Sequence, residues 1–184
     1  MRPQENSRRR FLGHAARLAL ASAVLPLTRP ALAALPNSRY LAFEHTHTGE
    51  RLSIVYALGE RHLPNALQRL NFFLRDHYSG AVGTIDPQLF DLLFRIREEL
   101  ACDQPFQVIS GYRCAETNAR LRRTRGGGVA RQSLHMEGKA IDVRIGGVAL
   151  ADLREVAIAQ ETGGVGFYAD ADFVHLDTGR VRYW

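Results

Sequence analysis

The sequence has few cysteines and no apolar run long enough to cross a membrane. Its two cysteines, Cys102 and Cys114, are not at metal-ligand spacing, which argues against a structural zinc site with four protein ligands. They leave two alternatives open, a disulfide across the short segment between them or two free thiols. Arg17 and Pro26 interrupt the apolar stretch near the start, whereas a transmembrane helix needs roughly 20 apolar residues. We therefore expect no transmembrane anchor in the mature protein.

The start of the chain has the three parts of an export signal. The basic segment Ser7–Leu12 resembles the twin-arginine motif, a moderately apolar segment covers Ala15–Leu27, and Ala31–Ala33 matches an A-x-A cleavage site. The sequence thus predicts a signal peptide over residues 1–33. Residues 34–184 are predicted to form one domain, periplasmic or otherwise exported by the twin-arginine route.

The predicted signal also carries the whole excess of positive charge. The chain has a net charge of +5 and a pI of about 9.7, which would suit a nucleic-acid partner. Residues 1–33 contain six Arg and one Glu, so 18 basic and 18 acidic residues remain in the predicted domain. The mature domain is neutral, and we expect no nucleic-acid partner.

Apolar periodicity in the predicted domain indicates an α+β fold, with helices packed on a mostly antiparallel sheet. Two β-prone runs flank Thr48 and Gly49, as in a hairpin. Helices are expected from Pro64 and from the Asp86-Pro87 pair, a good N-cap followed by proline, with Arg97 as one exposed break in an apolar stripe. The further expected elements are strands in "FQVIS", "KAIDVRI", "GGVGFY" and "FVHLD" and helices in "AETNARLRR" and "ALADLREVAIAQ".

Two histidines and one aspartate in these elements form a candidate metal site. Asp142 lies within the predicted strand "KAIDVRI", His135 lies seven residues before it, and His175 lies in the strand "FVHLD". Two imidazoles and one carboxylate leave one coordination position open, as catalytic zinc sites require. The sequence therefore predicts one catalytic zinc ion bound by His135, Asp142 and His175.

A non-haem iron oxygenase is a second hypothesis, because such enzymes also bind their metal through two histidines and one carboxylate. In that class the first histidine and the carboxylate are normally two residues apart on a jelly roll, whereas they are seven apart here in an α+β pattern. A third hypothesis is a binding module, with or without metal, that catalyses no reaction. His45 and His47 are expected on the hairpin surface and not at a second metal site.

The segment "SLHMEGKAID", with the later "DFVH", resembles the zinc D-alanyl-D-alanine carboxypeptidases and murein endopeptidases, which share a fold with Hedgehog signalling domains. The stretches "SGYRCAETNARLRR", "GGVGFY" and "DFVHLDTGRVRYW" look most like the YcbK-like murein endopeptidases. The likeness covers nearly the whole predicted mature chain. It implies a peptidase that cleaves bonds involving D-amino acids in peptidoglycan cross-links. The alternatives are a D,D- or L,D-carboxypeptidase that trims stem peptides and a non-catalytic peptidoglycan-binding module. We expect a monomer.

The resemblance also implies roles for single residues. His135, Asp142 and His175 match the zinc ligands, and Asp172 matches the general base, with Asp177 as its alternative. Arg113 matches an arginine that faces the substrate, where a guanidinium could stabilise an oxyanion or bind a carboxylate. Ser133, Tyr168 and Trp184 are the predicted substrate contacts, although Ser133 could equally cap a turn.

Overall fold

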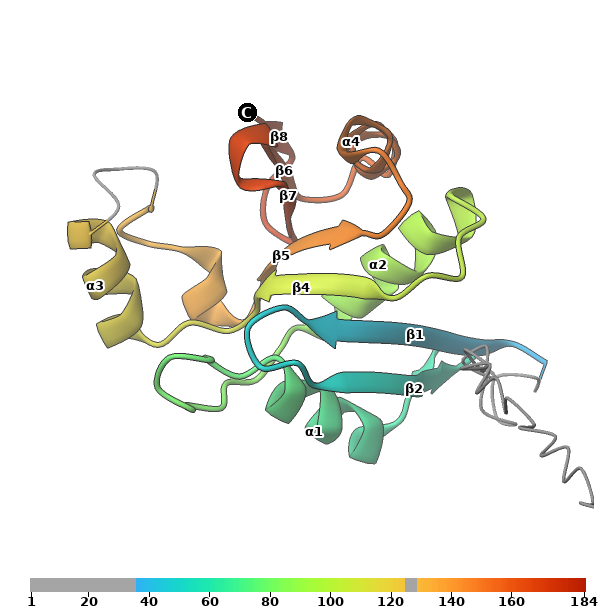
Figure 1. Cartoon of the computed structure of the whole chain (residues 1–184). Coiled ribbons are helices and arrows are strands. Elements are labelled where there is room, and N and C mark those ends of the chain that lie inside the picture. Colours follow the sequence, from blue (N-terminus) through green and yellow to red (C-terminus); the bar gives the residue numbers. More distant parts are fainter. Residues whose placement is uncertain (1–35, 125–128) are drawn as a thin grey trace, which may run out of the picture.

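The computed structural model describes residues 36–124 and 129–184, which form one eight-stranded sheet with helices (Figure 1). The strands are β1 (Ser38–His45), β2 (Arg51–Leu58), β3 (Arg61–His62), β4 (Phe106–Ser110), β5 (Ala140–Ile145), β6 (Gly164–Tyr168), β7 (Phe173–Asp177) and β8 (Arg182–Tyr183). The helices are α1 (Pro64–Phe73), α2 (Pro87–Glu99), α3 (Ala115–Thr124) and α4 (Leu150–Ala159), with 3-10 turns η2 (Leu134–Glu137) and η3 (Ala169–Ala171). The predicted signal peptide lies outside the described residues. Of the helices described, none has the length and apolar character needed to cross a membrane.

The strand order is β3-β2-β1-β4-β5-β7-β6-β8. Five of the neighbouring pairs are antiparallel, and two pairs, β1 with β4 and β6 with β8, are parallel. The predicted α+β class with a mostly antiparallel sheet is therefore confirmed. The expected hairpin is also present, because β1 and β2 pair along their length on either side of the Thr48 turn.

One face of the sheet packs against helices, and the other carries the candidate ligands. Helices α1, α2 and α4 cover one face, where Ile141, Val143, Val174 and Leu176 join the main apolar core. Because strand side chains alternate, the residues between them point to the other face, and these include the candidate ligands Asp142 and His175. Helix α3 lies beyond one end of the strands, at the left of Figure 1.

Helix α2 begins as its sequence predicts. The Asp86 carboxylate accepts a hydrogen bond from the Gln88 N–H, and Pro87 occupies the first helical position, where no N–H is needed. The other Asp86 oxygen accepts from the Thr178 hydroxyl at 2.7 Å, and the Asp86 N–H donates to the Gly138 carbonyl. This one residue therefore ties the start of α2 to both segments that flank β5 and β7.

The prediction that Arg97 is exposed is wrong, since only 4% of its surface is accessible. Its position in the apolar stripe turns the side chain inward, where the guanidinium donates to the backbone carbonyls of Tyr40 and Cys102 and to the Asp103 carboxylate. A buried arginine is tolerated when its donors are satisfied in this way. Arg97 therefore joins the end of α2 to β1.

The two cysteines are free thiols, so the disulfide alternative is not realised. Cys102 precedes β4 and Cys114 follows it, and the five strand residues between them span about 16 Å. A disulfide needs Cα atoms within about 7 Å. The extended strand therefore keeps the two thiols apart.

His45 is also placed differently from expectation, because it is almost fully buried and not on the hairpin surface. It follows Leu41 and Phe43 on the core face of β1, and its ring packs against the Phe73 ring of α1. The His77 ring lies 5.3 Å from it and stacks on His47. The Nε2 atoms of His45 and His77 are buried without a hydrogen-bond partner among the described residues.

Burial, together with the neighbouring histidines, lowers the pKa of both His45 and His77 to about 4. In the unfolded chain a histidine has a pKa of about 6.5, so the unfolded state binds more protons between these values. The stability that comes from keeping these two histidines neutral is fully present above pH 6.5 and is lost as the pH falls toward 4.

We predict that His77→Phe, which preserves the stacking, loses about 1 kcal/mol less unfolding free energy between pH 7 and pH 5 than the wild type. Urea unfolding at both pH values measures this difference, and equal losses in the two proteins would contradict it.

Candidate metal centre

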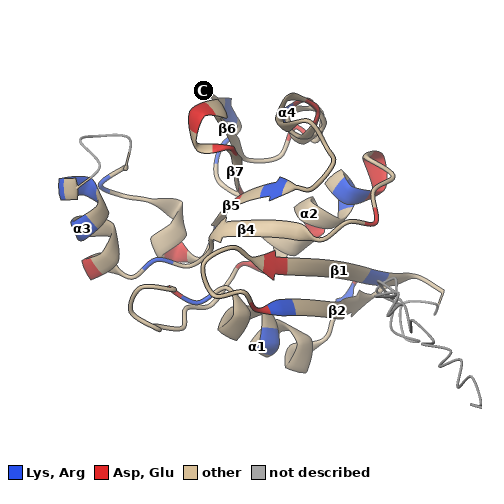
Figure 2. Ribbon diagram, viewed as in Figure 1, with Lys and Arg blue, Asp and Glu red and all other residues tan. Residues whose placement is uncertain are grey.

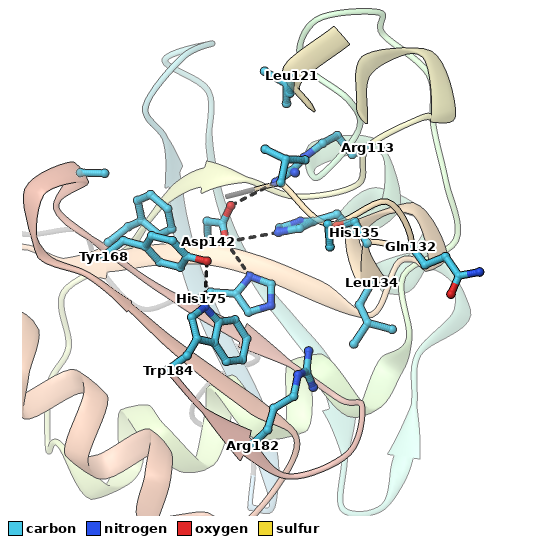
Figure 3. Close-up of a pocket in the computed structure, with 15 residues that line it drawn as sticks. Arg113, Leu121, Gln132, Leu134, His135, Asp142, Tyr168, His175, Arg182 and Trp184 are labelled. Carbon is cyan, nitrogen blue, oxygen red and sulfur yellow. Dashed lines mark hydrogen bonds and ion pairs between the residues drawn. The ribbon is translucent and has the colours of Figure 1, made fainter. Parts of the chain in front are cut away.

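The three predicted ligands meet in space. His135, Asp142 and His175 each offer a ligand atom, and these atoms all lie within 4.8 Å of one another. They form the only such group of three or more His, Cys, Asp or Glu found in residues 36–124 and 129–184. Figure 3 shows the three side chains turned toward a common point, with the Asp142 carboxylate between the two imidazoles.

His135 reaches this point from the turn η2. Its Nδ1 donates to the Gly111 carbonyl at 2.7 Å, which leaves Nε2 directed at the Asp142 carboxylate at 3.2 Å. The turn ends at Gly138, whose φ of +67° lies in the left-handed region. A Cβ at this position would lie 1.9 Å from the Thr84 carbonyl oxygen, so only glycine fits.

Asp142 is held by its strand neighbours. In the antiparallel pair of β5 and β7 it lies directly opposite His175, and its Oδ1 is 2.8 Å from His175 Nδ1. The other oxygen, Oδ2, accepts from the Arg113 guanidinium at 3.2 Å. Burial alone would raise the pKa of Asp142, but the two histidines lower it well below its ordinary value. The carboxylate is therefore charged, as a metal ligand must be.

Arg113 is buried and also donates to the Ser110 hydroxyl. It follows β4, so the strand end fixes its backbone beside the site. The role of Arg113 toward the substrate stays a prediction. The structure places its guanidinium in an ion pair with Asp142, a contact that the sequence did not indicate.

His175 lies between two carboxylates. Its Nδ1 faces Asp142, and its Nε2 is 3.1 Å from Asp177 Oδ2. Burial alone would lower the pKa of His175, but the hydrogen bonds to Asp142 and Asp177 raise it to about 9 in the metal-free protein. Asp177 is fully buried, and both of its oxygens are engaged. This arrangement argues against Asp177 as the alternative general base.

Asp172 has an exposed carboxylate that pairs with the Arg144 guanidinium of β5. It occupies a left-handed backbone position, with φ of +54°, just before β7. The neighbours on either side, Ala171 and Phe173, line the cavity above the three candidate ligands, whereas Asp172 is not among the residues that line it. Of the two carboxylates considered as base, only Asp172 is accessible to solvent.

A cavity of about 350 Å³ opens above the ligands. All three predicted substrate contacts, Ser133, Tyr168 and Trp184, line it. The Trp184 Nε1–H donates to the Tyr168 hydroxyl at 2.8 Å, so the two aromatic side chains form one wall (Figure 3). Ser133 precedes η2 but its hydroxyl makes no capping hydrogen bond there.

Positive charge borders this cavity. Arg113 and Arg182 line it, and α3 carries Arg120, Arg122 and Arg123 close to its wall residue Leu121. Figure 2 shows this basic helix beyond the strand ends. The sequence analysis did not predict that Arg182 lines the cavity. Its place in "DTGRVRYW", shortly after the "FVHLD" strand that carries His175, was the available signal.

The donor set fits a divalent metal ion. Each candidate ligand directs one atom at the other two ligands, and its second atom is bonded elsewhere, to Gly111, Arg113 or Asp177. Such outer contacts fix the orientation of ligands in metal sites. A mixed sheet that presents this donor set on the floor of a cavity suits a metal-dependent enzyme.

Comparison with known proteins shows the family to which this chain belongs. The family model described as peptidoglycan L,D-endopeptidase MepK matches residues 33–184, and the chain belongs to this family. Over 167 residues it is 41% identical to the peptidoglycan L,D-endopeptidase MepK of Escherichia coli K12, with 91% of each chain covered. It is 40% identical over 168 residues to the probable enzyme of the same name from Haemophilus influenzae, covering 91% of this chain and 90% of the relative. The predicted resemblance to murein endopeptidases is thus confirmed.

Metal binding is expected to stabilise the fold, because the ligands converge only in the folded chain. Zinc at about 100 times its dissociation constant should raise the unfolding free energy by about 2.7 kcal/mol. Removal of one ligand by His135→Ala should abolish most of this gain, whereas His47→Ala, at an exposed histidine outside the site, should retain it. Denaturant unfolding with zinc and with a chelator measures the effect. An equal gain in both variants would contradict the assigned ligands.

Proposed function

We propose that this chain is an exported zinc metallopeptidase that hydrolyses peptide bonds between L- and D-configured residues in peptidoglycan cross-links. The observation that carries the proposal is the convergence of His135, Asp142 and His175 within 4.8 Å on the floor of a cavity. The names of the relatives, which are L,D-endopeptidases of peptidoglycan, support the substrate class.

The ligand set supports zinc. Two imidazoles and one carboxylate are a known catalytic zinc set, and they leave room for water and substrate. When bound, zinc polarises the scissile carbonyl and lowers the pKa of a water molecule to about 7. His135 and His175 contribute neutral nitrogen donors, and Asp142 contributes the negative charge that balances part of the charge of the ion.

Asp172 is the proposed general base. It lies between two residues that line the cavity, and its carboxylate is exposed to solvent. The carboxylate pairs with Arg144, which lies two residues after Asp142 on β5. In this role Asp172 takes a proton from the attacking water and delivers it to the departing amine.

Arg113 is the proposed electrostatic partner of the substrate. Its guanidinium lines the cavity and lies next to Asp142, so positive charge is available where the carbonyl oxygen gains negative charge. Tyr168 and Trp184 supply a flat apolar wall for the stem peptide, and Ser133 supplies a hydroxyl without another partner at its turn. The basic residues at the cavity suit the carboxylates of stem peptides.

Export by the twin-arginine route is part of the proposal. It rests on the "SRRRFL" segment and on the A-x-A site that ends at Ala33. The family match from residue 33 onward agrees with a functional domain that begins after this signal. The proposed location is the periplasm, where peptidoglycan is accessible.

The direct test is to incubate the purified, zinc-loaded protein with muropeptide dimers of defined cross-link type and to resolve the products by mass. We expect dimers joined by an L,D bond to be converted to monomers, and a chelator to stop the reaction. Release of a single terminal residue from stem peptides, with dimers unchanged, would instead identify a carboxypeptidase. If neither dimers nor monomers are cleaved, the protein is a peptidoglycan-binding module without catalytic activity.

Asp172→Asn tests the base. We expect kcat to fall by about 10²- to 10⁴-fold, the usual contribution of a general base, with little change in zinc content. Asp170→Asn is the matched control, because Asp170 is also exposed and lies two residues earlier. Activity of Asp172→Asn close to that of the control would exclude Asp172 as the base.

A further inference from the structure

Asp177 is a fully buried carboxylate whose bonding has no explanation in the proposed reaction. Its Oδ1 accepts from the Gly164 N–H at 2.9 Å, the Gly179 N–H at 2.8 Å and Arg182 Nη1 at 3.1 Å. Its Oδ2 accepts from Arg182 Nη2 at 2.7 Å and from His175 Nε2 at 3.1 Å. Five donors therefore fix this side chain in one orientation.

The surrounding backbone is shaped for this carboxylate. A Cβ on Gly164 would lie 2.5 Å from Asp177 Oδ2, and one on Gly179 would lie 3.0 Å from Oδ1. Gly163, with φ of +72°, would bring a Cβ within 1.6 Å of the Asp177 carbonyl oxygen. Three glycines thus clear the space around one aspartate, which indicates a built site.

The bonding of Oδ2 has a consequence for the neighbouring ligand. A carboxylate can only accept hydrogen bonds, so the His175 nitrogen that faces Asp177 must carry a proton. This nitrogen is Nε2, and the opposite nitrogen, Nδ1, faces Asp142 at 2.8 Å. Asp142 is also a carboxylate, so both ring nitrogens can donate in the metal-free protein. A metal ion bound at Nδ1 needs the lone pair of that nitrogen, and the remaining proton is then on Nε2, where Asp177 accepts it.

We propose that Asp177 is a positioning residue that selects the metal-binding tautomer of His175. Arg182 and the amides of Gly164 and Gly179 hold the Asp177 carboxylate, and the carboxylate holds the imidazole. This inference rests on the proposed zinc site. It replaces the role of Asp177 as an alternative base with a role that acts through His175.

Asp177→Asn tests the tautomer directly, because asparagine has nearly the same shape. The three donors at Oδ1 require an acceptor, so the amide oxygen must remain there and the amide NH₂ must take the place of Oδ2. His175 Nε2 would then face a donor and become the acceptor. The proton moves to Nδ1, where it blocks the metal.

The experiment compares zinc affinity, measured by competition with a chelator, in the wild type and in three variants. We expect Asp177→Asn to bind zinc about 10- to 100-fold more weakly, the usual effect of losing an outer partner of a ligand. Asp152→Asn removes the same charge at an exposed site and should bind like the wild type. Arg182→Gln leaves the bond between Asp177 and His175 in place, and should lower the melting temperature more than the zinc affinity.

A spectroscopic measurement separates positioning from general support of the fold. In ¹H–¹⁵N spectra of the zinc-free Asp177→Asn protein, neutral His175 should carry its proton on Nδ1. A variant that melts earlier but binds zinc as the wild type does, or that keeps its proton on Nε2, would overturn the inference. Failure of the wild type itself to bind zinc would refute the proposed function instead.

Discussion

The antiparallel pairing of β5 with β7 is the constraint on which the site depends. It sets Asp142 directly opposite His175, and such cross-strand neighbours have Cβ atoms about 4.5–5.5 Å apart. On the other face of the same strands, Ile141 and Val174 belong to the core under the helices. A shift by one residue would exchange the two faces, burying the ligands among apolar side chains. The packing of the core therefore enforces the distance between two of the three ligands.

The third ligand depends on a different kind of contact. His135 lies on a short turn, and this turn is fixed by close approaches to segments distant in sequence: Gly138 against the Thr84 carbonyl, and the His135 imidazole against the Gly111 carbonyl. The Asp86 N–H adds a bond to the Gly138 carbonyl. Turn geometry thus brings His135 to the strand pair, with the start of α2 as its support.

Much of this organisation could be predicted from the sequence, because strand and helix periodicity are local signals. Alternation in "KAIDVRI" and "FVHLD" indicates which side chains share a face, and the residue types, together with the resemblance to known peptidases, indicate the candidate ligands. The errors concern polar residues on core faces. Arg97 and His45 were assigned to the surface from their chemical type, although their spacing places them inward, and the bonds that make burial tolerable for Arg97 come from distant residues. The hydrogen bonds of Asp177 also could not be predicted from the sequence. Its five donors come from three separate parts of the chain, which no local pattern reveals.

The site is assembled on a sheet whose apolar core is complete without any ion. In small zinc domains the ion is the nucleus of folding, and the apo chain is a coil. Here the donors lie on the face of β5 and β7 opposite a large apolar core, which stabilises the fold by burial of its own side chains. The residues that fold the domain are therefore different from those that would bind the metal, so folding and metal loading have separate determinants in the sequence.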